Sequence, residues 1–272
     1  MKKGAVLGCT MFLLVFVGLL AIGGDLVAHR AIVITNDHEF TVENGVCSGS
    51  GTVEDPYVIE NWLIDAGFDD YGIRIHGTTR AFVIRAVEIA GAAKSGIYLS
   101  YVQNGIVEDC TLEANWTGIT LNFASFNRIT GSTFEKNTDG IRTYFSHNNQ
   151  VLDSQFIEND TAIWLDASND NRISGNLISE SHMGVYLNLG SQQNTVIYNA
   201  FVGNLHAAYT DDPNLWDDGT RGNYWGGFSG IDANEDGIWD LPYLISNDGD
   251  QDNFPMVTHS LVPEPPPATC AP

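Results

Sequence analysis

The sequence predicts an all-β protein, a single-stranded parallel β-helix of about seven coils of roughly 22 residues each. Three observations support this prediction: a small residue recurs every 22 positions, apolar and outward-facing residues alternate after it, and the repeats lack helical spacing. The small residues are Gly72, Gly96, Gly118, Gly140, Ala162, Gly184 and Ala207. Stacking at ~4.8 Å would join the apolar residues of successive coils into continuous interior columns.

A second strand is predicted in the other half of each coil, because two further apolar columns recur with nearly the same period. One column is Val107, Ile129, Val151, Ile173 and Val196, and the other is Leu112, Phe134, Phe156, Ile178 and Phe201. These segments are short and are separated by Asn-, Asp- and Gly-rich corners. They leave no room for a helix within the repeat.

Two polar columns recur at the corners between the strands. One is Asn115, Asn137, Asn159, Ser181 and Asn204, and the other is Cys110, Ser132, Ser154, Asn176 and Asn199. Asn favours turns in any fold, but that preference does not explain the strict spacing. The columns therefore predict stacks in which each side chain bonds to its neighbour and to the corner backbone.

The net charge and the N-terminal segment limit the possible partners and cellular location of the protein. The net charge of -22 excludes nucleic acid and an anionic membrane surface as partners, since both need a basic face. Residues 1–28 begin with two lysines and an apolar run, which predicts a signal peptide or a membrane anchor. We therefore expect an exported protein, periplasmic, cell-surface or extracellular, that contacts a membrane only through this segment.

The remaining chain divides by composition and repeat. Residues 31–70 are predicted to form the N-terminal cap and first coil, 71–212 the repeats and 213–258 a C-terminal cap. Residues 259–272 are rich in proline and are predicted to form a flexible tail. Caps are needed because an open solenoid end would pair with other sheet edges.

Segments at both ends of the repeat resemble the NosD-like family of parallel β-helix proteins. They are Gly49–Ile59 near the start, and Gly222–Trp225, Asp232–Tyr243 and Asp252–Pro255 near the end. The resemblance implies a right-handed β-helix that is exported from the cytoplasm. Founding members assist copper-site maturation of a reductase, whereas many relatives are carbohydrate-binding or sugar-hydrolase-like modules. A fold-level likeness does not choose among these roles.

Copper binding by this chain is not favoured by its residue content. A copper carrier needs clustered His, Met or Cys. The histidines are scattered along the chain, among them His38, His76, His147, His182, His206 and His259. Met183 and Met256 are the methionines outside the leader.

A calcium loop is predicted near the C-terminal end. Asp232, Asn234, Asp236, Ile238 and Asp240 alternate around Gly237, as in the first nine positions of a calcium-binding loop. Tyr243 replaces the bidentate Glu expected at position twelve, so one of Asp248, Asp250 and Asp252 would complete the shell. The alternative is an Asx-rich turn that needs no ion. In either case the segment would stiffen the cap.

The outward positions of the first strand predict a ligand surface. Arg142, Trp164 and Tyr186 share one column, and Asn122, Tyr144, Asp166 and Asn188 share the next. Aromatic faces stack on sugar C–H surfaces, while amide, carboxylate and guanidinium groups bond to hydroxyls, so we expect a polysaccharide or other glycan as the partner. The alternative is that aromatic residues are there because they favour strands.

A catalytic role is a weaker alternative. Asp139 lies in a segment that resembles a motif of polygalacturonase-like enzymes, and Asp160 and His182 follow in one corner column. Carboxylate pairs can act as general acid and base in glycoside cleavage. However, Thr161 stands where a paired acid is expected, and the surrounding motif is incomplete. The sequence thus favours an exported glycan-binding module over a polysaccharide hydrolase or lyase, with a metal-maturation accessory protein as a further alternative.

Overall fold

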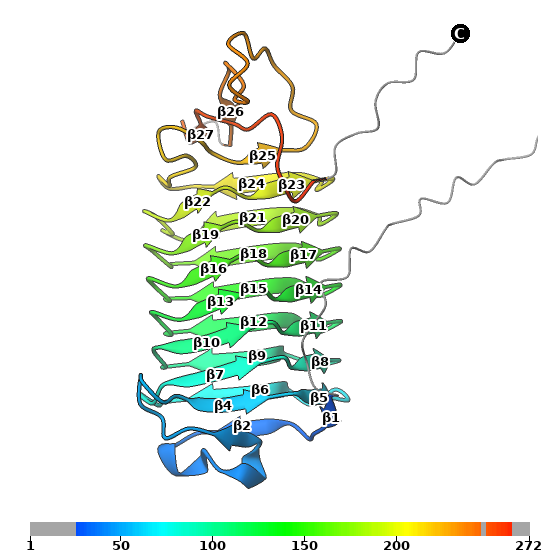
Figure 1. Cartoon of the computed structure of the whole chain (residues 1–272), viewed down its shortest axis with the longest axis vertical. Helices are drawn as coiled ribbons and strands as arrows, with labels where there is room; N and C mark the ends of the chain where they lie inside the picture. Colours follow the sequence, from blue (N-terminus) through cyan, green and yellow to red (C-terminus); the bar gives the residue numbers. More distant parts are fainter. Residues whose placement is uncertain (1–25, 246–248, 263–272) are drawn as a thin grey trace, which may run out of the picture.

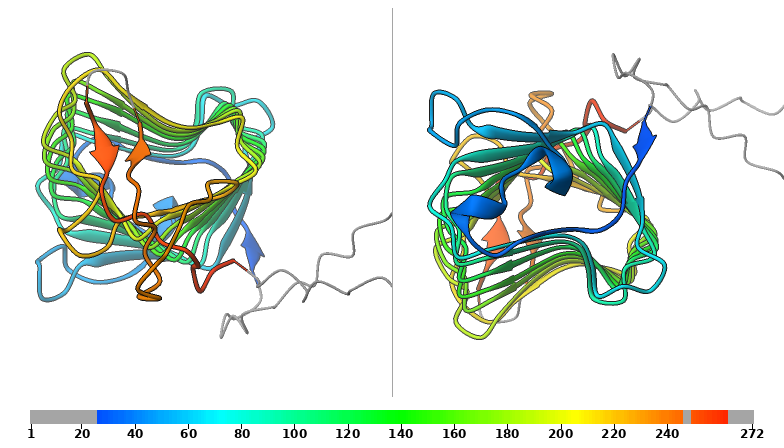
Figure 2. Two further views of the ribbon diagram at one scale, coloured as in Figure 1. Left: turned by 90° about the horizontal axis from the view of Figure 1, so that it is seen from above. Right: turned by 90° about the horizontal axis from the view of Figure 1, so that it is seen from below.

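The computed structural model describes residues 26–245 and 249–262, so residues 1–25 of the predicted leader and most of the tail lie outside the described residues, whereas Val27 and Ala28 form strand β1. Successive coils stack along one axis, and their strands form three sheets that are the walls of a solenoid (Figure 1). The coils superimpose around one closed outline when viewed along that axis (Figure 2). The fold is therefore the predicted all-β parallel β-helix.

The first sheet, here called the long sheet, has eight parallel strands. They are β2 (Ile32–Ile34), β6 (Tyr71–His76), β9 (Ser95–Ser100), β12 (Thr117–Asn122), β15 (Asp139–Tyr144), β18 (Thr161–Asp166), β21 (Met183–Asn188) and β24 (His206–Thr210).

The second sheet also has eight strands: β3 (Val46–Ser48), β4 (Tyr57–Glu60), β7 (Phe82–Arg85), β10 (Gly105–Glu108), β13 (Arg128–Thr130), β16 (Gln150–Leu152), β19 (Arg172–Ser174) and β22 (Thr195–Ile197). All its pairings are parallel except that of β3 with β4.

The third sheet has nine strands: β1 (Val27–Ala28), β5 (Trp62–Asp65), β8 (Glu88–Ala90), β11 (Thr111–Glu113), β14 (Thr133–Glu135), β17 (Gln155–Ile157), β20 (Leu177–Ser179), β23 (Ala200–Val202) and β25 (Tyr224–Trp225). Two 3-10 turns, η1 (Asp37–Glu39) and η2 (Val42–Asn44), and a hairpin of β26 (Tyr243–Leu244) and β27 (Gln251–Asp252) lie near the ends of the solenoid.

The structure adds a turn to the seven predicted from the repeat. Ile32 of β2 pairs with Ile73 of β6, although nearly two repeat lengths separate them. The intervening chain holds both 3-10 turns and three strands. Because this coil is longer than the others, it is invisible to a search for the 22-residue period.

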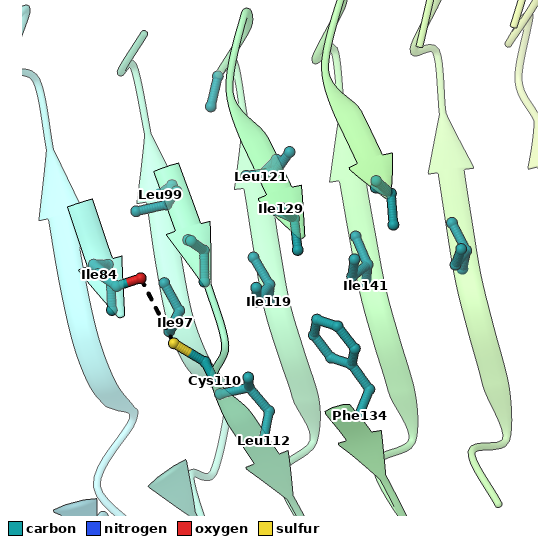
Figure 3. Packing of buried hydrophobic residues seen from close by; sticks show 14 of the residues in the cluster. Ile84, Ile97, Leu99, Cys110, Leu112, Ile119, Leu121, Ile129, Phe134 and Ile141 are labelled. Atoms are coloured by element: carbon teal, nitrogen blue, oxygen red, sulfur yellow. Dashed lines mark hydrogen bonds between the residues drawn. The ribbon is translucent and has the colours of Figure 1, made fainter. Parts of the chain in front are cut away.

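The interior consists of the predicted apolar columns. Ile97, Ile119 and Ile141 are register partners and fully buried, and Leu112 and Phe134 face them from the third sheet (Figure 3). Each fully buried side chain of this size stabilises the fold by about 1.5–3 kcal/mol. The columns therefore supply most of the stability of the rod.

The recurring glycine permits close approach of neighbouring coils. A Cβ built at Gly118 would lie 2.5 Å from the carbonyl oxygen of Gly140, and one at Gly140 would lie 2.5 Å from that of Ala162. A side chain at Gly118 or Gly140 would require the neighbouring coil to shift, whereas Ala162 shows that another coil accommodates a methyl group at the equivalent position. The repeat marker in the sequence thus has a steric cause.

The predicted Asn stacks are present. The backbone N–H of Asn115 donates to Oδ1 of Asn137 (2.9 Å), and that of Asn137 donates to Oδ1 of Asn159 (3.0 Å). The Nδ2 of Asn137 donates to the carbonyl oxygen of Leu112 (2.9 Å). Each amide therefore satisfies a corner N–H and a corner carbonyl that the sheets leave unpaired.

The structure also contains a third Asn stack, which the two predicted columns do not include. It comprises Asn127, Asn149, Asn171, Asn194 and Asn214. It lies at the corner that precedes the second sheet, where each coil has irregular backbone. The stack extends the same pairing rule to another corner of the coil.

The C-terminal cap ends two of these stacks with carboxylates. The N–H of Asn223 donates to Oδ2 of Asp252 (2.7 Å), and that of Asn214 donates to Oδ2 of Asp250 (3.0 Å). A Cβ at Gly222 would lie 1.8 Å from Oδ1 of Asp252, so only glycine leaves room for that carboxylate. The contact joins two of the closing segments of the sequence, Gly222–Trp225 and Asp252–Pro255.

Candidate functional site

The candidate site is a groove on the outer face of the long sheet. Its volume is about 470 Å³. It spans the coils of β6, β9, β12 and β15 and the corners that lead into these strands. It is lined by Tyr71, Ala93, Lys94, Ser95, Tyr98, Trp116, Thr117, Thr120, Arg142 and Tyr144.

The groove floor is polar, yet it is screened from solvent. Ser95, Thr117 and Asp139 begin successive strands of the long sheet and are only 2–3% exposed. The hydroxyl groups of Ser95 and Thr120 lie 2.7 Å apart, and Nδ2 of Asn122 donates to the hydroxyl of Tyr98 (2.9 Å). A polar floor of this kind can exchange its hydrogen bonds with the hydroxyls of a ligand.

Arg142 organises one end of the groove. Its guanidinium donates to Oδ2 of Asp139 (3.2 Å) and to Oδ2 of Asp166 (3.3 Å). It also lies 3.7 Å from the ring centroid of Trp164 and 5.0 Å from that of Tyr144. Four predicted ligand residues, Arg142, Trp164, Asp166 and Tyr144, thus form one contact network with Asp139.

The other predicted ligand residues extend this surface along the axis. Tyr186 contacts Trp164 edge-on, with ring centroids 5.1 Å apart. Asn188 is the register partner of Asp166, one coil further on. One face of the Trp164 ring is covered by Arg142, and its Nε1 donates to Oδ1 of Asp166 (2.8 Å). Trp164 therefore supports the network and does not offer a free ring.

Burial sets the electrostatics of the groove. It raises the pKa of Asp139 above its ordinary value, although Arg142 opposes the shift. Burial also raises the pKa of the Tyr144 hydroxyl, again against Arg142. Two carboxylates thus share one guanidinium in a poorly solvated place, where charge–charge interactions are strong.

The three predicted catalytic residues lie in neighbouring coils. Asp139 is buried at the start of β15, next to the groove residues Thr117 and Arg142. Asp160 and His182 lie at an exposed corner, with Oδ1 of Asp160 3.8 Å from Nδ1 of His182, and the charge of Asp160 contributes to the raised pKa of Asp139. Asp139 bonds to Arg142 and shares it with Asp166.

Of the ten groove residues, Arg142 and Tyr144 belong to the predicted ligand set and the other eight do not, among them Tyr71, Lys94 and Trp116. Lys94 and Trp116 occupy the corner position immediately before the strand, one repeat apart. The alternation of inward and outward residues applies only within strands, so it does not identify side chains at this corner. The 22-residue spacing between Lys94 and Trp116 is the sequence signal that identifies the column.

The predicted calcium ligands lie together in an exposed loop of the cap. Both carboxylate oxygens of Asp232 accept N–H groups of the loop, from Asp236 (3.1 Å) and Gly237 (3.0 Å). Oδ1 of Asp236 accepts the N–H of Ile238 (2.9 Å), and Oδ2 of Asp240 accepts that of Ala233 (3.0 Å). These bonds are those of an Asx-rich turn.

The residues proposed to complete the calcium shell are used elsewhere. Nε1 of Trp216 donates to Oδ2 of Asp250 (3.0 Å), and Nε1 of Trp225 donates to Oδ2 of Asp252 (2.8 Å). Asp248 lies outside the described residues. Calcium stays a prediction for Asp232, Asn234, Asp236, Ile238 and Asp240.

A family model for the periplasmic copper-binding protein NosD matches residues 64–230, more than half of the chain. The chain belongs to the NosD family. Two curated relatives carry the name probable ABC transporter binding protein NosD. The one from Stutzerimonas stutzeri is 36% identical over 74 residues, which is 25% of this chain and 16% of the relative. The one from Pseudomonas aeruginosa is 32% identical over 71 residues, or 25% and 17% of the two chains.

The aligned region thus spans less than a fifth of each curated NosD relative. Two solved structures are similar in outline. The complex of XylC with xylose has a TM-score of 0.45 and 11% identity, covering 76% of this chain and 39% of that one. The pectate lyase Pel9A has a TM-score of 0.44 and 13% identity, covering 80% and 73%. The assignment of the fold rests on the strand pairing itself.

The residues of this NosD-family chain do not fit the copper site that the family description implies. No group of three or more His, Cys, Asp or Glu side chains in residues 26–245 and 249–262 is arranged to hold a metal ion. His182 and His206 come closest, with ring centroids 5.6 Å apart. Burial raises the pKa of the Cys110 thiol to about 12, so it is not a thiolate ligand at neutral pH.

The same described ranges contain no helix long and apolar enough to cross a membrane.

Proposed function

We propose that this NosD-family protein is an exported carbohydrate-binding module that holds an extended glycan in the groove of the long sheet. One observation carries the proposal: aromatic side chains and a sheltered floor of hydroxyl groups line one continuous hollow across several coils. The family description as periplasmic supports export.

The residues of the groove divide into two kinds. Trp116 is 61% exposed at its rim, and Tyr98 lies next to Tyr71 with ring centroids 4.9 Å apart. Such rings bury apolar sugar faces at low entropic cost. Asn122, Tyr144, Asp166 and Asn188 lie in the neighbouring column and supply donors and acceptors. Repetition of these groups along the axis suits a polymer.

The proposed role is binding without cleavage. A glycosidase needs two carboxylates on either side of the scissile bond, one of them free to accept or give a proton. Here Asp139 and Asp166 are both bonded to Arg142. The alternative, a hydrolase or lyase, predicts new reducing ends or unsaturated products that disappear in Asp139→Asn or Asp160→Asn.

Affinity electrophoresis against a panel of neutral and acidic polysaccharides tests the proposal. We expect at least one polymer to retard the wild type. Trp116→Ala should weaken that binding about tenfold, the value of one aromatic contact, and Tyr98→Ala and Trp164→Ala should also weaken it. Phe126→Ala is the matched control, because Phe126 is 57% exposed and lies outside the groove. Unchanged migration on every polymer would refute the proposal.

A second candidate function is an accessory role in metal-site maturation, which membership of the NosD family favours. It predicts tight copper binding that depends on His182 and His206. A copper titration of the wild type and of the His182→Ala and His206→Ala variants decides between the two functions.

A further inference from the structure

Arg74 has an unusual environment for an arginine of this chain. It is half-buried in β6, and its Nε is buried without a hydrogen-bond partner, as is that of half-buried Arg142, but Arg142 has two ion pairs and Arg74 has none. Within the described ranges, no carboxylate lies within ion-pair distance of it. The other described arginines without ion pairs, Arg30, Arg128, Arg172 and Arg221, are all exposed. In a chain of net charge -22, a sheltered guanidinium without an anion requires an explanation.

The surroundings of Arg74 belong to the groove. Its guanidinium carbon lies 5.7 Å from the ring centroid of Tyr71, and Nζ of Lys94 lies 5.9 Å from the same centroid. Arg74 is the register partner of Tyr98, which also lines the groove. Two cations therefore flank one aromatic ring at the end of the groove nearest the N-terminus.

The opposite end of the groove differs in charge balance. Arg142 is neutralised there by Asp139 and Asp166, two carboxylates of the chain itself. At the near end, Lys94 is paired with exposed Asp70 at 2.8 Å, and Arg74 has no such partner. The protein thus supplies carboxylates to Arg142 at one end of the groove and none to Arg74 at the other.

We propose that Arg74, with Lys94, binds the carboxylate of an acidic sugar, so that the glycan in the groove is a uronate. This inference rests on the proposed function and names its ligand class. A carboxylate accepts charge-assisted hydrogen bonds from a guanidinium and would supply the anion that Arg74 lacks. The aromatic rings of Tyr71 and Tyr98 then contact the apolar face of the same sugar or its neighbour.

The test compares uronate oligosaccharides with their methyl esters, which keep the sugar backbone and lose the charge. Titration calorimetry of the wild type should give at least about tenfold tighter binding of the acid, the value of one charge-assisted hydrogen bond. Arg74→Gln should bind acid and ester equally. Arg172→Gln removes the same charge from an exposed position on β19 and should keep the preference. Thermal unfolding of each variant checks that it is folded.

Each other outcome overturns the inference. Equal binding of acid and ester by the wild type, or a preference that persists in Arg74→Gln, refutes the carboxylate site and leaves the glycan groove standing. Binding of neither form, together with no retardation by any polymer, refutes both. If inorganic phosphate binds as tightly as the acid and Arg74→Gln abolishes both, the site is a general anion site and not a sugar site.

Discussion

The repeat coils and the C-terminal cap both provide hydrogen-bond partners for corner backbone groups, but they use different side chains. Within the coils, each Asn accepts an N–H from one coil and donates its amide to a carbonyl of the same neighbour, as Asn137 does. In the cap, Asp252 accepts the N–H of Asn223 and the indole N–H of Trp225. The amide suits a corner with both donors and acceptors, whereas the carboxylate suits one with donors alone.

This difference has energetic consequences. The Asn stacks of the coils are neutral, so they add little pH dependence to the stability. The cap instead buries an ionisable group, whose cost depends on pH. The following predictions separate the two regions.

The largest effect is expected in the coils. Asn137→Ala removes the acceptor of two buried donors, the N–H and Nδ2 of Asn115, and orphans the carbonyl of Leu112. At 1–3 kcal/mol for each buried group left unpaired, we expect a loss of about 4 kcal/mol of unfolding free energy. Urea unfolding measures it. Ser181→Asn, in the same stack, is the control and should be near neutral; a loss below about 1 kcal/mol in Asn137→Ala would contradict the stack's role.

The next effect concerns the pH dependence of the cap. Burial raises the pKa of Asp252 to about 6, above its ordinary value of 3.8. The folded state therefore binds this proton more tightly than the unfolded state, and ionisation between pH 4 and pH 6 reduces stability as pH rises. The unfolding free energy lost through this ionisation amounts to about 3 kcal/mol at most.

Unfolding free energies of the wild type and Asp252→Asn, measured from pH 4 to pH 7, test this assignment. The wild type should lose more stability than the variant over this range, because the variant has no proton to lose at that position. Parallel profiles would show that Asp252 does not titrate in this window.

A smaller effect is expected at Thr143, which breaks the pattern of the coils. It occupies an interior apolar column between Leu121 and Leu165, and its buried hydroxyl has no hydrogen-bond partner. Thr143→Val keeps the shape and removes the unpaired group, so we expect about 1 kcal/mol of added stability in urea unfolding. Thr133→Val, at a half-buried outward position, is the control and should change little. A destabilised Thr143→Val would indicate a partner for the hydroxyl.

The smallest effect is expected in the exposed loop of the cap. If calcium binds Asp232, Asn234, Asp236, Ile238 and Asp240 as predicted, millimolar calcium should raise the unfolding temperature by a few degrees, on the order of 1 kcal/mol. Asp236→Asn should reduce the rise. An unfolding temperature that neither calcium nor a chelator changes would show that the loop is only an Asx turn.

Much of the architecture could be predicted from the sequence, because the 22-residue period places equivalent residues in vertical columns. The apolar columns and two Asn stacks follow directly from it. A first coil was expected within residues 31–70, but its strand pairing could not be predicted, since the chain from Ile32 to Ile73 does not keep the period. The groove was predicted only in part, because Lys94 and Trp116 lie at a corner outside the alternating strand pattern.

The sequence by itself determined which residues share a column, because the number of residues in a coil fixes which positions lie one above another. Only the tertiary structure decided which side chains of neighbouring columns contact one another. It covered one face of Trp164 with Arg142, left Arg74 without a carboxylate, and assigned Asp250 and Asp252 to the ends of the Asn stacks. Such contacts depend on side-chain direction and on the bend of the sheet, and neither is periodic in the sequence.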